Sequence, residues 1–343
     1  MGQTNCPNYK LIMKKFVSFF LSLAFAGSTF AQMSGYSTSQ SDGTTLGANE
    51  TLTADGIALG NAVKLRGYVD FRLQRMDSGS TGMDTTHAHN DTDLLIDLSP
   101  VTAEVHLNVS KNSSDILEQA FGRYSFNQDF HLTFGRQASV LGFDGDEPTD
   151  LYAVTRAYRG IGNTNPGKGY FDGIRLNYNN GMFGFIFGLH DQYGLHTGSS
   201  DDLDSGIAID IAASVMFFPG LEARLGFVNE NGGSNPDDAQ QINGWIGWNP
   251  NALTLAVEFD SFSFADDTDA WDMMLLANYQ FSDFFGATLR YSHMDFESLE
   301  SDRITFAFLF TITENFDINL EYSHTDNDGA DDDEFYLQAL LSY

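Results

Sequence analysis

The sequence is poor in cysteine, in basic residues and in long apolar runs. Its one cysteine among 343 residues, Cys6, precedes an apolar segment near the amino terminus, so the rest of the chain has no thiol. An exported protein without disulfides must draw its stability from packing and from a sheet that satisfies its own hydrogen bonds. Beyond that first segment no window holds the roughly 18 consecutive apolar residues of a transmembrane helix, which excludes a helical membrane protein.

Basic residues are few, because 17 Lys and Arg stand against 47 Asp and Glu, and the formal net charge is −30. Such acidity argues against nucleic acid as a partner. It fits a high-salt habitat, attraction of cations, or divalent ions bound at a cell surface, and composition does not choose among these three explanations.

The amino-terminal segment has the pattern of a secretory signal peptide. Lys14 and Lys15 precede the apolar run 16–26, and small residues lead to Ala31, after which we expect cleavage. Met13, directly before the lysines, indicates that residues 1–12 come from an early start codon. Removing residues 1–31 deletes three lysines and no acid, which moves the formal charge from −30 to −33. We interpret residues 32–61, rich in Ser, Thr and Gly, as a flexible periplasmic segment.

From residue 62 apolar and polar residues alternate, which predicts strands with one apolar and one polar face. Val63, Leu65 and Val69 alternate in this way with Lys64 and Arg66, and the same period recurs to the end of the chain. The sixteen predicted strands are 62–75, 91–98, 101–110, 116–126, 129–136, 170–178, 182–190, 205–218, 221–229, 240–249, 253–262, 270–281, 284–293, 303–312, 316–324 and 335–343.

Connections between the predicted strands alternate strictly between tight turns and longer polar linkers. Ser99-Pro100, Pro219-Gly220 and Ser282-Asp283 are typical tight turns, whereas 76–90 and 137–169 are long. This polarity predicts an antiparallel up-and-down transmembrane β-barrel over 62–343, with short periplasmic turns, long external loops and both termini in the periplasm. Aromatic residues such as Phe130 flank the tight turns, as in an interfacial girdle, although aromatics are also simply favoured in strands.

Nearly all strand charge falls on one face of the predicted strands. Since a basic side chain facing lipid near mid-membrane would cost about 2–4 kcal/mol, this segregation indicates that the other face meets lipid. Glu118, Arg136 and Asp172 break the rule, and we expect them at strand ends or bulges. The basic residues predicted to line the lumen are Lys64, Arg66, Arg72, Arg123, Arg175, Arg224 and Arg290.

The last predicted strand resembles the carboxyl-terminal signature that the barrel-insertion machinery of Gram-negative bacteria recognises. Its outward face would consist of Phe335, Leu337, Ala339, Leu341 and the terminal Tyr343. Outer-membrane proteins with this signature more often end in Phe.

With these features the chain resembles a Gram-negative outer-membrane porin, and of the porin families the OmpL-like ones. The resemblance covers 62–343 and includes the stretches 134–143 and 169–175. It implies a homotrimer in the bacterial outer membrane, with outer-membrane lipid, the insertion machinery and small hydrophilic solutes as partners. It also implies that the loop between strands five and six, here 137–169, folds into the lumen and narrows it.

The loop 137–169 carries a set of charged residues that we expect at the constriction: Asp144, Asp146, Glu147, Asp150, Arg156 and Arg159. Its acids would lie opposite Arg66, Arg72, Arg123 and Arg175, and the resulting transverse field would orient dipolar solutes. Equally, the lumen arginines could serve only to stabilise the wall.

Motifs of catalysis and metal binding give no firm signal. His106, His131 and His190 are too dispersed to predict a zinc site, and the segment 324–335 has calcium-loop spacing but the wrong residues at both ends. No nucleophile or phosphate-loop motif occurs. We expect no cofactor, no metal and no catalytic residue.

The sequence therefore predicts passive diffusion of small hydrophilic solutes or ions, with a preference for cations if the excess acids line the path. One alternative is a non-conducting surface adhesin or structural barrel with a plugged lumen. A less favoured alternative is an outer-membrane hydrolase with its site in the external loops, and at the level of fold the rival is a soluble sandwich or propeller.

Overall fold

The computed structural model describes residues 46–49, 51, 54–78, 81–110, 116–145, 147–158, 169–195, 206–232, 238–296, 299–327 and 330–343. The chain divides into Met1–Ser34 and Gly35–Tyr343. The predicted signal peptide lies outside the described residues, and the second unit contains every strand described below.

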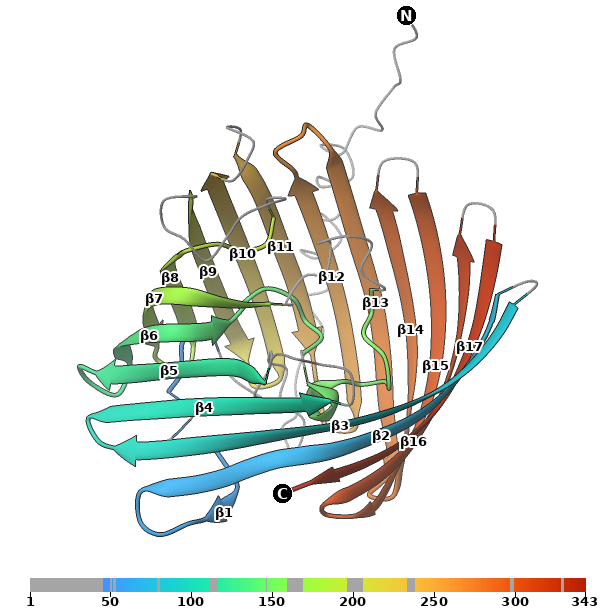
Figure 1. Ribbon diagram of the computed structural model, residues 1–343, viewed down its shortest axis with the longest axis horizontal. Helices are drawn as coiled ribbons and strands as arrows, with labels where there is room; N and C mark the ends of the chain where they lie inside the picture. The colour runs from blue at the N-terminus through green and yellow to red at the C-terminus, as the bar shows by residue number, and fades with distance from the viewer. Residues whose placement is uncertain are drawn as a thin grey trace, which may run out of the picture. The chain divides into compact units, whose positions relative to one another are not determined.

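Sixteen antiparallel strands form a closed barrel, as the sequence predicts (Figure 1). Each of these strands pairs with the strands before and after it in the chain, and the pairing of β2 with β17 closes the ring. The strands are β2 (Val63–Ser78), β3 (Thr81–Leu98), β4 (Val101–Ser110), β5 (Leu117–Ser125), β6 (Phe130–Ala138), β7 (Tyr170–Asn179), β8 (Phe183–His190), β9 (Gly206–Phe218), β10 (Leu221–Gly232), β11 (Ala239–Trp248), β12 (Leu253–Ser263), β13 (Asp269–Ser282), β14 (Phe285–Phe296), β15 (Leu299–Thr313), β16 (Phe316–Asn327) and β17 (Ala330–Ser342).

A further strand of two residues, β1 (Ile57–Ala58), was not predicted. It pairs with Leu65 and Lys64 of β2, at the end of β2 that β17 does not reach. Where β17 ends, Gly67 and Tyr343 exchange two backbone hydrogen bonds of 2.9 Å each. The edge of β2 is therefore covered by two separate segments of the chain.

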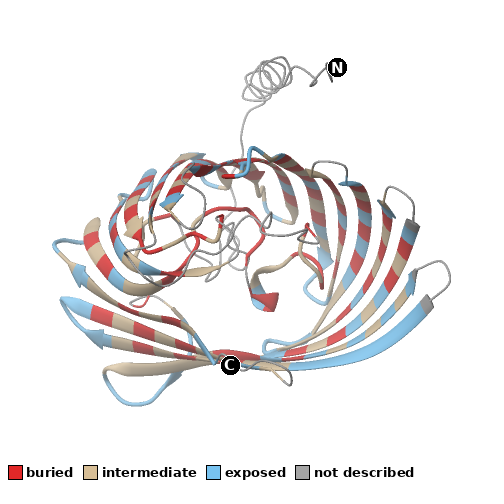
Figure 2. Ribbon diagram, turned by 45° about the horizontal axis from the view of Figure 1, so that its top comes forward, coloured by how far each residue is buried: buried red, intermediate tan, exposed pale blue. Residues whose placement is uncertain are grey.

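Alternation along each strand sorts side chains into two environments, and bands of buried and exposed residues cross the strands in Figure 2. On β4, Thr102, Glu104 and His106 are buried on the inner face, whereas Val101 and Val109 are exposed on the outer face. Within the described part of the chain, no helix is long and apolar enough to span a membrane. The one helical turn among these residues is the 3-10 turn η1 (Pro148–Asp150).

The three predicted exceptions to the charge rule have a structural explanation. The register between β4 and β5 shifts opposite Glu118, so that Glu118 occupies a bulge. Arg136 and Asp172 are cross-strand partners near the ends of β6 and β7, and their charged atoms lie 3.7 Å apart.

The connections at the end opposite the tight turns differ from the prediction. The predicted loop 76–90 is mostly strand, because β2 and β3 continue pairing as far as Ser78 and Thr81. Residues 81–90 are polar on both faces, so no apolar period marked them as strand. Likewise, β14 to β17 extend through most of the predicted loops 294–302 and 325–334.

The apolar outer face yields a stability prediction. Leu289 is 49% exposed midway along β14, whereas Phe284 lies at the tight turn before that strand. We expect Leu289→Lys to lower the free energy of unfolding in lipid bilayers by about 2–4 kcal/mol, and Phe284→Lys by about 0–1 kcal/mol, because the cost of a charge falls toward the interface. Denaturant titration in liposomes measures both values. Equal losses at the two positions would mean that this face does not meet hydrocarbon.

Candidate functional site

The connection between β6 and β7 runs inside the barrel, where its described residues 139–145 and 147–158 lie against the inner face of the opposite wall (Figure 2). Backbone amides of the loop donate to wall side chains: Gly142 to Asn243 on β11 at 3.0 Å, and Phe143 to Glu258 on β12 at 3.0 Å. Thr155 donates its amide to Glu321 on β16 at 2.9 Å. The loop thus crosses the lumen from β6 toward β11–β16.

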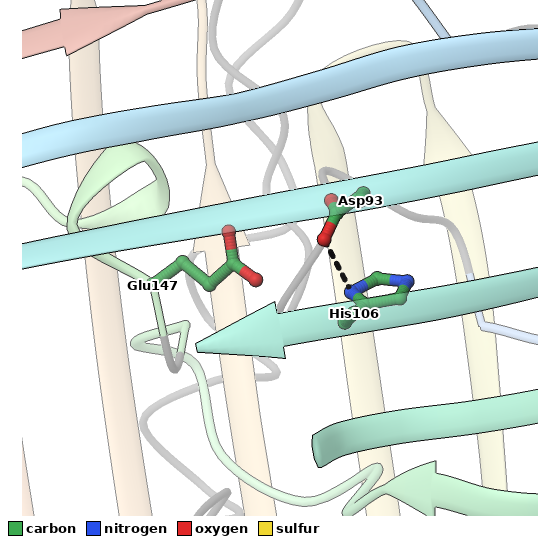
Figure 3. Close-up of side chains that lie close together, drawn as sticks. All are labelled: Asp93, His106 and Glu147. Carbon is green, nitrogen blue, oxygen red and sulfur yellow. Dashed lines mark ion pairs between the residues drawn. The ribbon is translucent and has the colours of Figure 1, made fainter. Parts of the chain in front are cut away.

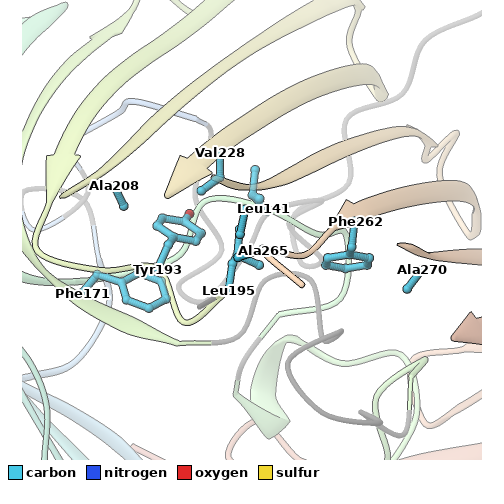
Figure 4. Close-up of a cluster of buried hydrophobic side chains, with 10 residues drawn as sticks. Leu141, Phe171, Tyr193, Leu195, Ala208, Val228, Phe262, Ala265 and Ala270 are labelled. Carbon is cyan, nitrogen blue, oxygen red and sulfur yellow. The ribbon is translucent and has the colours of Figure 1, made fainter. Parts of the chain in front are cut away.

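Apolar contacts hold the beginning and the middle of the loop in place. Leu141 packs in a buried cluster with Phe171, Tyr193 and Phe262, which Figure 4 shows inside the barrel. At Gly226 on β10, an added Cβ would lie 2.2 Å from a methyl carbon of Leu141, so only glycine leaves room for this contact. A second cluster packs the loop against β11–β13, and its members are Phe143, Tyr152, Ala157, Tyr158, Trp245, Ala256, Met274 and Leu276.

The strongest charged contact of the loop joins Asp144 to Arg290 on β14. Their nearest atoms lie 3.0 Å apart, and the Arg290 side chain is fully buried. Arg290 also donates to the carbonyl oxygens of Thr155 and Arg156, each at 2.8 Å. Asp144 in turn accepts the Ala157 amide at 2.8 Å. One buried wall arginine therefore fixes two separate parts of the loop.

Arg303 on β15 is a lumen arginine that the sequence analysis missed. It lies 3.1 Å from Glu334 and 3.6 Å from Glu321, and it donates to the Thr155 hydroxyl at 3.1 Å. The signal was present, because Arg303 shares the inward face with Thr305 in the predicted strand 303–312, but it stands at that strand's first position.

The four wall arginines that were predicted to face the loop acids also have partners on the wall. Each of these arginines pairs with a carboxylate of the wall, on the same strand, on the neighbouring strand or, for Arg175, two strands away. The pairs on the wall, with Arg224 included, are Arg66–Asp93 (2.9 Å), Arg72–Asp70 (2.5 Å), Arg123–Glu104 (3.6 Å), Arg175–Asp210 (2.7 Å) and Arg224–Glu222 (3.5 Å).

Other predicted site residues occupy separate places. Lys64 donates to the carbonyl oxygen of Ala54 at 2.6 Å, near the tight-turn end of β2. Glu147 is 7% exposed, and its carbonyl oxygen accepts the Asp150 amide within η1 at 3.0 Å. Burial lowers the pKa of the Arg156 guanidinium, and the charge of Asp144 counteracts part of this effect. Asp146 and Arg159 lie outside the described residues.

Residues 46–49 and 51, from the segment 32–61 that was predicted as flexible, also lie against the inner wall. Leu46 is buried against Ile186 and Ala212, and its carbonyl oxygen accepts a hydrogen bond from Asn179 at 2.8 Å. Farther along, the Asn49 side chain accepts from Arg123 at 2.7 Å. Small polar residues suit this path because they satisfy polar groups of the wall.

Between the loop and the wall formed by β2, β3 and β17 lies a cavity of about 540 Å³ with a polar lining. Arg72 comes from the wall, and Arg156 from the loop. The described residues that line it are Arg72, Gln74, Thr85, Thr86, His87, Leu151, Val154, Thr155, Arg156 and Tyr336. This space is the right size and chemistry for a small hydrophilic molecule.

The residues predicted as the carboxyl-terminal signature lie on β17 as expected for an outward face. Phe335, Leu337 and Leu341 are exposed, and Ala339 shares their face. Tyr343 lies beside β3, with its hydroxyl 3.0 Å from that of Thr92 and 3.2 Å from the side-chain nitrogen of Asn90. A terminal Phe would lack these hydroxyl contacts.

The fold is similar to those of porins of known structure. OmpF of Salmonella typhi, in complex with daunomycin, aligns with a TM-score of 0.66 at 15% identity, over 83% of this chain and 98% of that chain. The anion-selective porin from Comamonas acidovorans aligns with a TM-score of 0.61 at 14% identity, over 82% and 99%. A mutant of the Rh. blastica porin aligns with a TM-score of 0.55 at 12% identity, over 82% and 100%. No protein-family model matches the chain, and no curated protein matches its sequence.

The Asp144–Arg290 contact gives a prediction about loop anchoring. Replacing Arg290 by Met leaves a buried carboxylate without its cation, and we expect a loss of about 3–5 kcal/mol in the free energy of unfolding. Adding Asp144→Asn should recover part of that loss. The control is Arg75→Met, since Arg75 is exposed on β2, and it should change stability by about 0.5 kcal/mol or less.

Hydrogen exchange of the loop amides distinguishes anchoring from general weakening. Exchange at Phe143 and Ala157 should accelerate in Arg290→Met more than exchange in β9 or β10 does. Uniform acceleration would contradict a specific role in holding the loop.

Proposed function

We propose that the protein is a porin of the bacterial outer membrane, which lets small hydrophilic solutes or ions diffuse passively through its lumen. The observation that carries the proposal is the cavity of about 540 Å³ that the inward-folded loop leaves against a charged barrel wall. Export by the predicted signal peptide, assembly as a homotrimer, use of the insertion machinery and the OmpL-like likeness all remain predictions.

The outer face of the barrel supports a membrane location. It exposes large apolar side chains on every side, among them Phe71, Leu176, Leu225, Phe306 and Leu337. The ring leaves no open sheet edge among the sixteen strands, so the backbone groups of the ladder are satisfied without water. An apolar band around a closed ladder fits a hydrocarbon environment.

The inner face supports a preference for cations. Buried inward carboxylates outnumber buried or half-buried inward guanidinium groups on the described strands. The acids are Asp70, Asp91, Asp93, Glu104, Asp210, Glu222, Glu230, Glu258, Asp260, Asp272, Glu321, Asp332 and Glu334, and the arginines are Arg66, Arg72, Arg123, Arg175, Arg224, Arg290 and Arg303. An excess of fixed negative charge along a narrow path concentrates cations.

A plugged, non-conducting surface barrel is the second candidate. Both the loop and the segment around 46–51 occupy lumen space, and they bury apolar clusters there. These contacts would stabilise a structural barrel as well as a narrow pore. The two candidate functions are therefore distinguished by whether ions pass through the lumen.

Single-channel recording in planar bilayers tests conduction. The folded protein should give discrete current steps in KCl. Protein that inserts into the bilayer without such steps, with folding verified by heat-modifiable migration in gels, would favour the plugged barrel.

Ion selectivity tests the role of the cavity. Arg72 lines the cavity, and Arg75 on the same strand is exposed on the opposite face. We expect Arg72→Gln to raise the permeability ratio of K⁺ to Cl⁻, because it removes a positive charge from the path, and Arg75→Gln to leave that ratio unchanged. Reversal potentials in a KCl gradient measure the ratio. An unchanged value in Arg72→Gln would take Arg72 out of the permeation path.

A further inference from the structure

Four carboxylates and one imidazole meet where the inward loop passes β3, β4 and β5. The ligand atoms of Asp91, Glu118 and Glu147 all lie within 4.8 Å of one another, and so do those of Asp93, His106 and Glu147. Figure 3 shows the second group, in which the Glu147 side chain comes from the loop toward Asp93 and His106 on the wall. Glu147 is common to both groups, so the cluster joins loop and barrel.

Asp91 is the residue that the surrounding protein leaves unsatisfied. Its side chain is fully buried, and neither carboxylate oxygen has a hydrogen-bond partner among the described residues. A buried carboxylate without a donor or a counter-charge costs several kcal/mol, and neighbouring carboxylates add repulsion. A bound cation would relieve this cost.

Two cationic side chains of the wall contact acids of this region other than Asp91. Arg66 donates to Asp93 from two nitrogens, at 3.0 and 2.9 Å. The two ring nitrogens of His106 lie 3.0 Å from Asp93 and 3.0 Å from Glu104. Asp93 and His106 are thus paired with each other, and they flank the Asp91 side of the cluster.

Glu118 faces this cluster because of the bulge in β5. In a regular ladder, alternation would place Glu118 on the outer face with Ala120, but the register shift turns it inward. The Asn108 side chain donates to its Oε1 at 2.5 Å, and its Oε2 has no partner among the described residues. Repulsion between the buried carboxylates of Glu118 and Asp91 destabilises this bulge unless a cation lies between them.

We propose that Asp91, Glu118 and Glu147 bind one Ca²⁺-like divalent cation, which ties the inward loop to the barrel wall. Three carboxylates form a hard, oxygen-only ligand set of the kind that Ca²⁺ prefers. Waters or backbone carbonyls would complete the coordination.

The ion gives the loop a second anchor. Asp144 fixes the loop to Arg290 on β14, and the ion fixes the η1 turn at Glu147 to β3 and β5, on another side of the lumen. Removing the cation frees the turn next to the cavity while leaving the Asp144 contact in place.

Terbium luminescence on the folded, detergent-solubilised full chain tests the site. Tyr68 is buried and lies directly opposite Asp91 in the ladder, so it can sensitise Tb³⁺ bound there. After EDTA treatment and its removal, we expect one saturable site that Ca²⁺ displaces. Asp91→Asn and Glu147→Gln should each weaken Ca²⁺ affinity about tenfold or more, because each removes a charged ligand.

The matched control is Asp97→Asn, on the same strand and the same face of β3 but exposed at the tight turn, where it bonds to Ser99. This variant should keep the wild-type affinity. Tyr68→Phe should lose sensitised emission and keep Ca²⁺ affinity in a calorimetric titration, which places the ion beside Tyr68.

Two results would overturn the proposal. One is wild-type protein that shows only many equivalent weak sites, as expected for exposed acids on a highly charged chain. The other is a single site whose affinity survives both Asp91→Asn and Glu147→Gln. If Asp91→Asn does not fold, Glu147→Gln decides alone, since Glu147 belongs to the loop and not to the ladder. The titration needs no ion flow, so its outcome is independent of whether the barrel conducts.

Discussion

Closure of the hydrogen-bonded ladder is the constraint on which the rest of this structure depends. Once β2 pairs with β17, the inward or outward direction of each strand residue is set by parity alone, except at bulges. This one condition places the apolar side chains outside and the charges inside. It also explains why a single register shift, at Glu118, is enough to change the chemistry of a patch of the inner wall.

The lumen is a charged interior that the protein must stabilise locally. Wall arginines achieve this mainly with acids on the same or adjacent strands, as Arg72 does with Asp70 and Arg66 with Asp93. The loop uses a different solution, because it brings Asp144 across the lumen to a fully buried arginine and covers apolar wall positions with its own aromatic side chains. In the proposed pore, selectivity and stability would share residues, because a change in one lumen charge also affects its partner on the wall.

Sequence periodicity was sufficient to predict the sixteen strands, because each spanning segment has an apolar face that the barrel exterior requires. It failed for the first half of β3, whose residues 81–90 have polar side chains on both faces. The alternation also predicted that the wall arginines point into the lumen. It did not predict which acids they pair with, because that depends on the register between strands. The association of Asp91, Glu118 and Glu147 was out of reach for a further reason: it combines a bulge with the path of a loop that has no periodic pattern.

The seam between β2 and β17 has a consequence for biogenesis. β17 follows every other barrel strand in the chain, and its pairing with β2, from Tyr68 to Ser78, closes the ring. Until β17 has been made, β2 and β16 each keep an unpaired edge. The barrel strand that is made first therefore stays open along one edge until the strand made last can pair with it.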